Sequence, residues 1–278
     1  MGLFSKIHEG SGKEIQRPSS RLTQFFYVIK SNLFIVTMVS FISVLFVLPL
    51  IAFGLVFFFN LFELYQKGDA AAIFSFGLTN SFLIIPFVML AAIGVCGSHS
   101  LFKKMVFSEV YRLSDFWYGI KENWWHFLII GFIKGLTISL LIFGWLFYGY
   151  YTTSNVILVR VLVTIQYVLI GMVLMFAATQ TVTYNIKMWP KIKNSILLMI
   201  SRFFGNLLIF AIRAIPLFLL LIFQTQILLI LLFVLVFVGG SIYSLLTVER
   251  CFKVFDDLMH KDELKQYYRK GLREKTLK

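Results

Sequence analysis

Residues 33–59 read LFIVTMVSFISVLFVLPLIAFGLVFFF and contain no charged side chain. About 20 apolar residues in a helix are enough to cross the hydrocarbon core of a bilayer, which is about 30 Å thick. We therefore predict that this run is a transmembrane helix, and that it tilts or bends because it is longer than the bilayer requires. Pro49 lies inside the run and removes a backbone hydrogen bond, which predicts a kink.

Five further apolar runs of comparable length follow along the chain. They lie at residues 81–102, 126–148, 156–179, 203–223 and 227–246. With 59% hydrophobic and 14% charged residues, the composition lies far outside the soluble range of about 45–50% apolar and 25% charged residues. The sequence therefore predicts an all-α polytopic membrane protein with about six transmembrane helices. Pro86 and Pro216 predict kinks in the second and the fifth of them.

The lysine and arginine residues outside these runs fall almost entirely on one side of the predicted membrane. The segment before the first run holds five, two of the connections hold four each, and the C-terminal tail holds nine. These are 22 of the 26 basic residues, whereas the opposite side has only Lys67. Because basic loops tend to stay in the cytoplasm, both termini of this cell-membrane protein are predicted to be cytoplasmic.

The net charge of +13 is thus interpreted as a signal of topology and of attraction to anionic headgroups, and no nucleic-acid partner is predicted. The chain divides into a cytoplasmic segment at 1–32, a transmembrane domain at 33–247 and a basic amphipathic cytoplasmic tail at 248–278. On the outer side we predict one longer loop, at 60–80, and two tight helical hairpins.

Two cytoplasmic segments have apolar faces that need either the membrane or a protein partner. Residues 114–125 are predicted to form a helix in the membrane interface, with aromatic side chains along one face. The tail is predicted to continue the sixth transmembrane helix, with two phenylalanines on its apolar face. The candidate partner-binding residues are Phe116, Trp117, Trp124, Phe252 and Phe255.

Three basic residues, Lys134, Arg160 and Arg213, lie inside the apolar runs. A charge at the centre of a transmembrane helix costs on the order of 3 kcal/mol, and the six runs contain no aspartate or glutamate to pair with one. In one interpretation, Lys134 and Arg160 snorkel to the headgroups and Arg213 binds carbonyl groups freed by Pro216. In the other, the three line a shared cavity that holds an anionic group, such as a lipid phosphate or an acidic sugar.

No motif in the sequence names a reaction, a metal or a cofactor. Cys96 and His99 are three residues apart, as two zinc ligands can be, but a zinc site needs three or four ligands, so no metal is predicted. The Walker, G-x-S-x-G, H-E-x-x-H and Rossmann patterns do not occur, so an enzyme is unsupported and no cofactor is expected. Gly131 and Gly135 form a small-xxx-small pair that would let two helices approach closely.

Two basic connections, together with the helices that follow them, carry recognisable patterns. The first pattern spans residues 86–124 and contains SDFW at 114–117 and IKENW at 120–124. The second spans residues 189–198 and contains KNS at 193–195. Both stretches resemble the YesL-like family of bacterial integral membrane proteins. The resemblance implies an accessory role beside carbohydrate ABC transporters, and it assigns no functional residue.

We therefore expect an accessory or scaffold protein of the membrane that contacts an ABC transporter, or another membrane-protein subunit, through its cytoplasmic face. The chain is not expected to be the permease itself, because its cytoplasmic loops lack the E-A-A-x-x-x-G coupling pattern. The alternative is a transporter or lipid-handling protein that binds an anionic group at the intramembrane basic residues. Membrane lipids are expected partners under both hypotheses.

Overall fold

The computed structural model describes residues 18–107, 109–151, 156–184, 186–222, 239–258 and 268–272, with the backbone alone at 148–151 and 213–222. The described residues form helices and contain no strand. In chain order the helices are α1 (Arg21–Gln66), α2 (Ala70–Ser81), α3 (Ile84–Val106), α4 (Ser114–Tyr151), α5 (Val156–Thr183), α6 (Met188–Ser201), α7 (Phe203–Ile222) and α9 (Gly240–Leu258).

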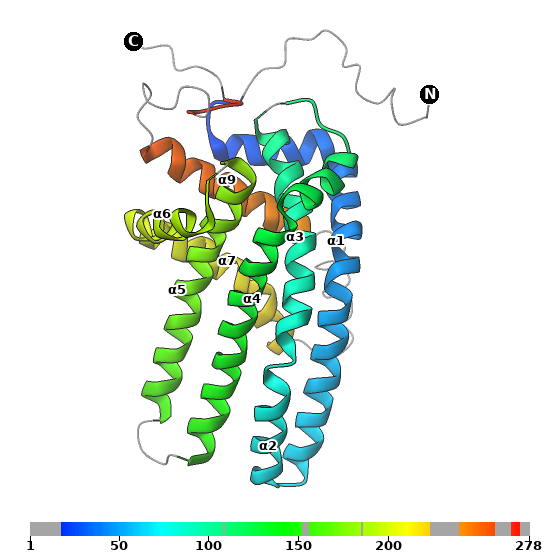
Figure 1. Cartoon of the computed structure of the whole chain (residues 1–278), viewed down its shortest axis with the longest axis vertical. Helices are drawn as coiled ribbons and strands as arrows, with labels where there is room; N and C mark the ends of the chain where they lie inside the picture. Colours follow the sequence, from blue (N-terminus) through cyan, green and yellow to red (C-terminus); the bar gives the residue numbers. More distant parts are fainter. Residues whose placement is uncertain are drawn as a thin grey trace.

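The long helices α1, α3, α4 and α5 run side by side along the long axis of the molecule, and α2 extends the line of α3 (Figure 1). These four are long and apolar enough to cross a membrane, and α6 with α7, bent by 95°, would make a fifth crossing. These helices confirm the prediction of an all-α protein whose long apolar helices are suited to cross a membrane. Most of the sixth predicted run, residues 227–238, lies outside the described residues.

Helix α1 begins well before the apolar run that predicts it. Ser20 and Thr23 form a reciprocal capping box, in which each side chain binds the other residue's backbone N–H group. The helical conformation breaks at Asn32 (φ −132°, ψ 28°), whose side chain accepts a hydrogen bond from the Tyr111 hydroxyl. The part before this break lies across the end of the bundle in Figure 1, where it is dark blue.

The predicted outer loop at 60–80 is wrong, because these residues are almost entirely helical. Helix α1 continues to Gln66, where Glu63 and Lys67 form an ion pair along its surface. A short turn follows, with Gly68 at a φ of +70° that favours glycine. The Asp69 side chain then accepts a hydrogen bond from the Ala72 N–H group and caps α2.

In place of the helix kink predicted at Pro86, the structure has a break between two helices just before this proline. The chain leaves the helical ladder after α2 and begins α3 at Ile84, so Pro86 lies in the first turn of a new helix. A proline is tolerated there because the N–H groups of the first turn have no intrahelical partner.

Helices α3 and α4 approach closely at the glycine pair that the sequence indicated. A Cβ atom on Gly131 would lie 2.7 Å from the Cα atom of Met89, and one on Gly135 would lie 2.9 Å from that of Ile85. Only glycine therefore fits at this contact. The stretch 114–125, predicted as a separate interfacial helix, forms the first turns of α4.

Most buried side chains gather at the end of the bundle where α6 and α9 lie (Figure 1). Along the rest of the bundle, large apolar side chains stay exposed, as Leu45 and Phe58 of α1 illustrate. A globular protein in water would bury such side chains, whereas lipid can surround them.

Candidate functional site

Arg160 lies near the start of α5, at the end of the bundle opposite α6 and α9 (Figure 1). Its guanidinium carbon is 5.2 Å from the centre of the Trp145 ring, near the end of α4. Its Nη2 atom also donates a hydrogen bond of 3.5 Å to the Trp145 carbonyl oxygen. A cation above an indole ring gains about 0.5–2 kcal/mol. The α4–α5 hairpin therefore holds the charged group of Arg160 against α4.

Thr164 completes this group of residues, which we call the Arg160 cluster: Trp145, Arg160 and Thr164. The Thr164 hydroxyl donates to the Arg160 carbonyl oxygen at 2.7 Å and accepts from the Trp145 indole N–H at 3.3 Å. The Arg160 Nε atom is buried and has no hydrogen-bond partner within the described structure. Within the described structure, the hydrogen-bonding capacity of the Arg160 guanidinium group is therefore only partly used.

A cavity of about 630 Å³ adjoins the Arg160 cluster. Its volume is within the range of about 300–1,000 Å³ that is typical of ligand pockets. Trp145 and Thr164 belong both to the cluster and to the cavity wall, so the two features are continuous. The other lining residues, almost all apolar, come from four helices: Phe57 and Leu61 of α1, Leu141, Ile142 and Leu146 of α4, Tyr167 and Val168 of α5, and Leu207, Phe210 and Ala211 of α7.

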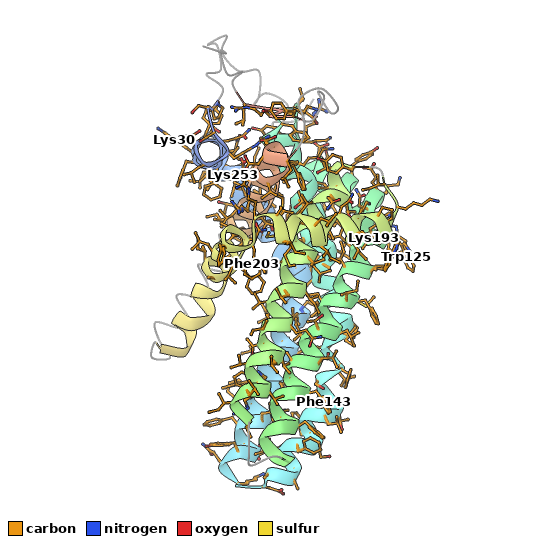
Figure 2. The ribbon with its side chains drawn as sticks, turned by 90° about the vertical axis from the view of Figure 1, so that its left-hand side faces the viewer. Lys30, Trp125, Phe143, Lys193, Phe203 and Lys253 are labelled. Carbon is orange, nitrogen blue, oxygen red and sulfur yellow. The ribbon has the colours of Figure 1, made fainter. Side chains whose placement is uncertain are left out.

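The α7 side of the cavity reflects how that helix leaves the bundle. Figure 2 shows α7, in pale yellow, diverging from the long helices beyond Phe203. Its first turns still contact α5, where Phe210 packs on Gly171. A space that is apolar along most of its wall, and whose wall includes two residues that contact Arg160, suits a molecule with an apolar body and an anionic head.

The structure separates Lys134 from this site. Lys134 is on an exposed side of α4, and it is eleven residues before Trp145, or about 16 Å along the helix. Lys134 and Arg160 therefore do not share a cavity. Arg213 belongs to α7, but its side chain lies outside the described residues.

The candidate partner-binding aromatic residues divide into two groups. Phe116, Phe252 and Phe255 are buried in the main hydrophobic core, among side chains of α1, α3 and α5. The apolar face of the tail helix is therefore covered by the chain itself, because α9 packs back onto the bundle. Trp117 and Trp124 remain about half exposed, at 52% and 46%. Only these two can contact a partner without rearrangement.

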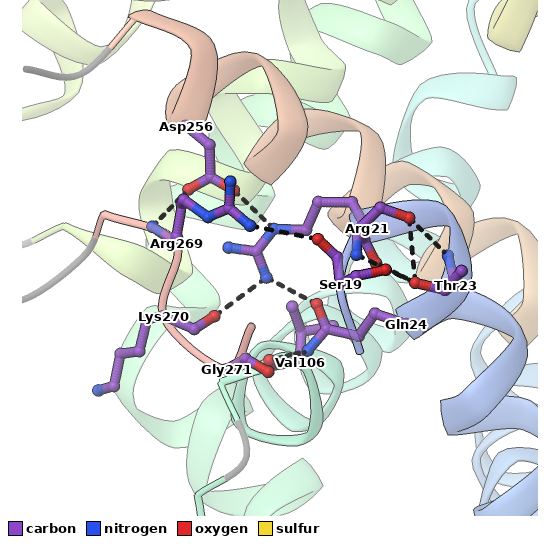
Figure 3. Close-up of polar contacts among 10 residues, drawn as sticks. Ser19, Arg21, Thr23, Gln24, Val106, Asp256, Arg269, Lys270 and Gly271 are labelled. Carbon is purple, nitrogen blue, oxygen red and sulfur yellow. Dashed lines mark hydrogen bonds and ion pairs between the residues drawn. The ribbon is translucent and has the colours of Figure 1, made fainter. Parts of the chain in front are cut away.

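The sequence reasoning missed a buried polar cluster at the opposite end of the molecule, which we call the terminal junction: Arg21, Gln24, Asp256, Arg269 and Lys270 (Figure 3). Arg21 Nε donates to Asp256 Oδ2 at 2.8 Å, and its Nη1 donates to Gln24 Oε1 and to the Lys270 carbonyl oxygen. The Arg269 N–H group donates to the other Asp256 oxygen at 2.8 Å. The junction ties the start of α1 to α9 and to the tail.

Glu249 lies two turns before Asp256 on α9 and is 3% exposed. Neither of its carboxylate oxygens has a hydrogen-bond partner within the described structure. Burial raises the pKa of Glu249 to about 8, an effect that the Arg21 charge opposes and the Asp256 charge reinforces. The helical spacing from Leu245 and to Phe252 could have indicated that Glu249 faces the core, but the flanking Arg250 and Lys253 suggested a solvated segment.

Cys96 and His99 are both buried in the packing of α3. Cys96 Sγ donates to the Gly119 carbonyl oxygen at 3.4 Å, and His99 Nδ1 is 3.1 Å from the Val95 carbonyl oxygen. Both side chains thus have structural contacts within the bundle.

Comparison with family models, with curated proteins and with solved structures gives no match for this chain. Its resemblance to the YesL-like family therefore stays a prediction from the two sequence patterns.

Proposed function

We propose that this chain is a six-span protein of the bacterial cell membrane, with both termini in the cytoplasm, and that it binds a lipid with an anionic headgroup. The observation that carries the proposal is the continuity of the Arg160 cluster with the apolar cavity through Trp145 and Thr164. The headgroup would contact Arg160, and an acyl chain would occupy the cavity.

The charge distribution supports the proposed orientation. The α1–α2 turn, at the end of the bundle where Arg160 lies, carries Lys67 as its one basic residue, while 14 basic residues of the described chain belong to segments at the other end. Under the positive-inside rule, the Arg160 cluster is then at the outer leaflet. The lipid would be an outer-leaflet lipid.

The lack of acidic residues supports an anionic ligand. No aspartate or glutamate occurs in the sequence between Glu122 and Glu249, a stretch that includes α5, α6, α7 and most of α4. A guanidinium group in a membrane needs an acceptor, and its planar N–H groups match a phosphate in two-point hydrogen bonding. The Arg160 guanidinium group, whose Nε atom has no hydrogen-bond partner among the described residues, is the donor that we propose for this contact.

Native mass spectrometry of the protein with phosphatidylglycerol tests the proposal. Wild-type protein is expected to retain one lipid in mild detergent, and Arg160→Gln is expected to weaken binding by about 10–100-fold, as for a lost hydrogen bond to a charged group. Lys134→Gln is the matched control, since it also removes an intramembrane cation but leaves the cavity unchanged. Equal lipid retention by the two variants would show that Arg160 only snorkels to bulk headgroups.

A second candidate function, that of an accessory protein for a transporter, rests on the exposed aromatic side chains in the first turns of α4. Trp117, Tyr118, Trp124 and Trp125 are each between 46% and 62% exposed. Such side chains suit a contact with another membrane-protein subunit, and the family resemblance suggests an ABC transporter. Affinity purification in mild detergent should recover that subunit with wild-type protein and lose it with the Trp117→Ala, Trp124→Ala double variant.

A further inference from the structure

Helix α6 lies across the bundle axis, unlike the long helices beside it (Figure 1). The chain turns by 95° between α6 and α7, at Arg202, whose backbone leaves the helical region. This helix was not predicted, because its residues belong to a basic connection between two predicted transmembrane runs.

One face of α6 packs on the protein. Lys191, Ser195 and Met199, at successive four-residue spacings, are all buried. The Ser195 hydroxyl accepts a hydrogen bond of 2.9 Å from the Gln180 amide of α5. This contact fixes how α6 is rotated about its own axis, and therefore which side chains face outward.

A second face is apolar and largely exposed within the part of the chain that the structure describes. Trp189, Ile196 and Ile200 fall on one side of the helix at spacings of seven and four residues, and they are 66%, 41% and 60% exposed. Past the bend, Phe204 and Leu208 near the start of α7 are also exposed. Apolar side chains thus follow the chain from the transverse helix into the helix that enters the predicted membrane.

The third face is polar. Asn194 and Ser201 are exposed on it, about a third of a turn from the apolar face. Lys193 lies between the two, with its Nζ atom 5.8 Å from the centre of the Trp189 ring. A lysine beside a tryptophan at the border of an apolar face is typical of the headgroup level of a bilayer.

We propose that α6 is an in-plane helix that binds the inner leaflet, with Trp189, Ile196 and Ile200 inserted below the headgroups and Asn194 facing the cytoplasm. Lipid is the occupant because exposed apolar side chains follow along the chain from α6 into α7, which is the helix that enters the predicted membrane. The exposed Lys187 and Lys193 also complement phosphate groups, and no acidic residue lies between Glu122 and Glu249 to offset them. The inference rests on the proposed membrane insertion but not on lipid binding at Arg160.

Nitroxide labels on single introduced cysteines, in full-length protein in phosphatidylglycerol nanodiscs, test this placement. The native cysteines, Cys96 and Cys251, are fully buried, so labelled wild-type protein provides the background. At Ile200→Cys, accessibility to oxygen is expected to exceed accessibility to a water-soluble nickel complex. At Asn194→Cys, on the polar face of the same helix, the order is expected to be reversed.

Leu45→Cys, on the exposed surface of α1, distinguishes the membrane insertion of the bundle from the in-plane placement of α6. A label there is expected to be oxygen-accessible whenever the bundle spans the bilayer. If position 45 is in lipid while positions 194 and 200 are equally accessible to nickel, the in-plane placement of α6 is wrong and membrane insertion stands. If position 45 is also accessible to nickel, membrane insertion itself is wrong.

Discussion

Three charged side chains are removed from water in three different ways. Arg21 is paired with Asp256 inside the terminal junction. Arg160 stacks on Trp145, and its Nε atom has no hydrogen-bond partner among the described residues. Glu249 has no hydrogen-bond partner among the described residues and instead has a raised pKa. A buried charge without a partner is costly, so an isolated carboxyl group tends to bind a proton, whereas an arginine must find an acceptor.

The protonation of Glu249 predicts how folding stability depends on pH. The pKa of the Glu249 carboxyl group rises from its ordinary value of 4.5 to about 8 in the folded protein, so the folded state binds the proton more tightly than the unfolded state does. This contribution to stability is complete below about pH 4.5 and is lost as the pH rises through about 8. Wild-type protein in detergent should therefore unfold at a lower temperature at pH 9 than at pH 6.

Glu249→Gln should reduce this pH dependence, because an amide is neutral at both pH values. At pH 9 the variant should have the higher Tm, with a gain of about 2–4 °C for each kcal/mol recovered. Glu63→Gln is the control, since Glu63 is exposed and its loss should not change the difference between pH 6 and pH 9. An unchanged pH profile in Glu249→Gln would contradict the assignment.

The helices themselves differ from the apolar runs mainly at their ends. Residues 60–66, which were predicted to be loop, continue α1, and a connection rich in lysine contains α6. Helix formation needs only compatible residues and a cap, while hydropathy reports how a segment partitions into lipid. Runs chosen by hydropathy therefore end earlier than the helices that contain them.

The contact between α3 and α4 predicts unequal effects for two glycine substitutions. Gly131→Leu would force side-chain atoms against the backbone of α3, whereas a Cβ atom at Gly54 on α1 would meet nothing within 4 Å, so Gly54→Leu starts from open space. We expect Gly131→Leu to destabilise the protein by about 1–3 kcal/mol and Gly54→Leu to leave stability nearly unchanged. Thermal unfolding in detergent measures both, and equal Tm values would contradict the close packing of these helices.

The molecule as a whole has two unlike ends. One contains the main core, the terminal junction and α6, while the other contains the α1–α2 turn, the Arg160 cluster and the nearby cavity. Close packing at the first end holds the helices in register, and the apolar surface of the remainder is suited to lipid. The two proposed lipid contacts are therefore on opposite leaflets.

The proposed orientation predicts which ends of the bundle are accessible from outside a cell. Lys67→Cys should react with a membrane-impermeant maleimide on intact cells, because it lies in the α1–α2 turn. Arg112→Cys, exposed before α4, should react only after permeabilisation. The reverse pattern would invert the orientation and place the Arg160 cluster at the inner leaflet.

The amino-acid sequence was sufficient to determine the helical class and the apolar segments, because insertion into lipid depends on the composition of about 20 consecutive residues. It also identified Arg160 as a candidate, since a charge inside such a segment is conspicuous. The partners of Arg160, the cavity beside it and the burial of Glu249, Phe252 and Phe255 were decided only by the tertiary structure. These features depend on which helix faces meet, and the packing that brings them together joins residues far apart in the chain.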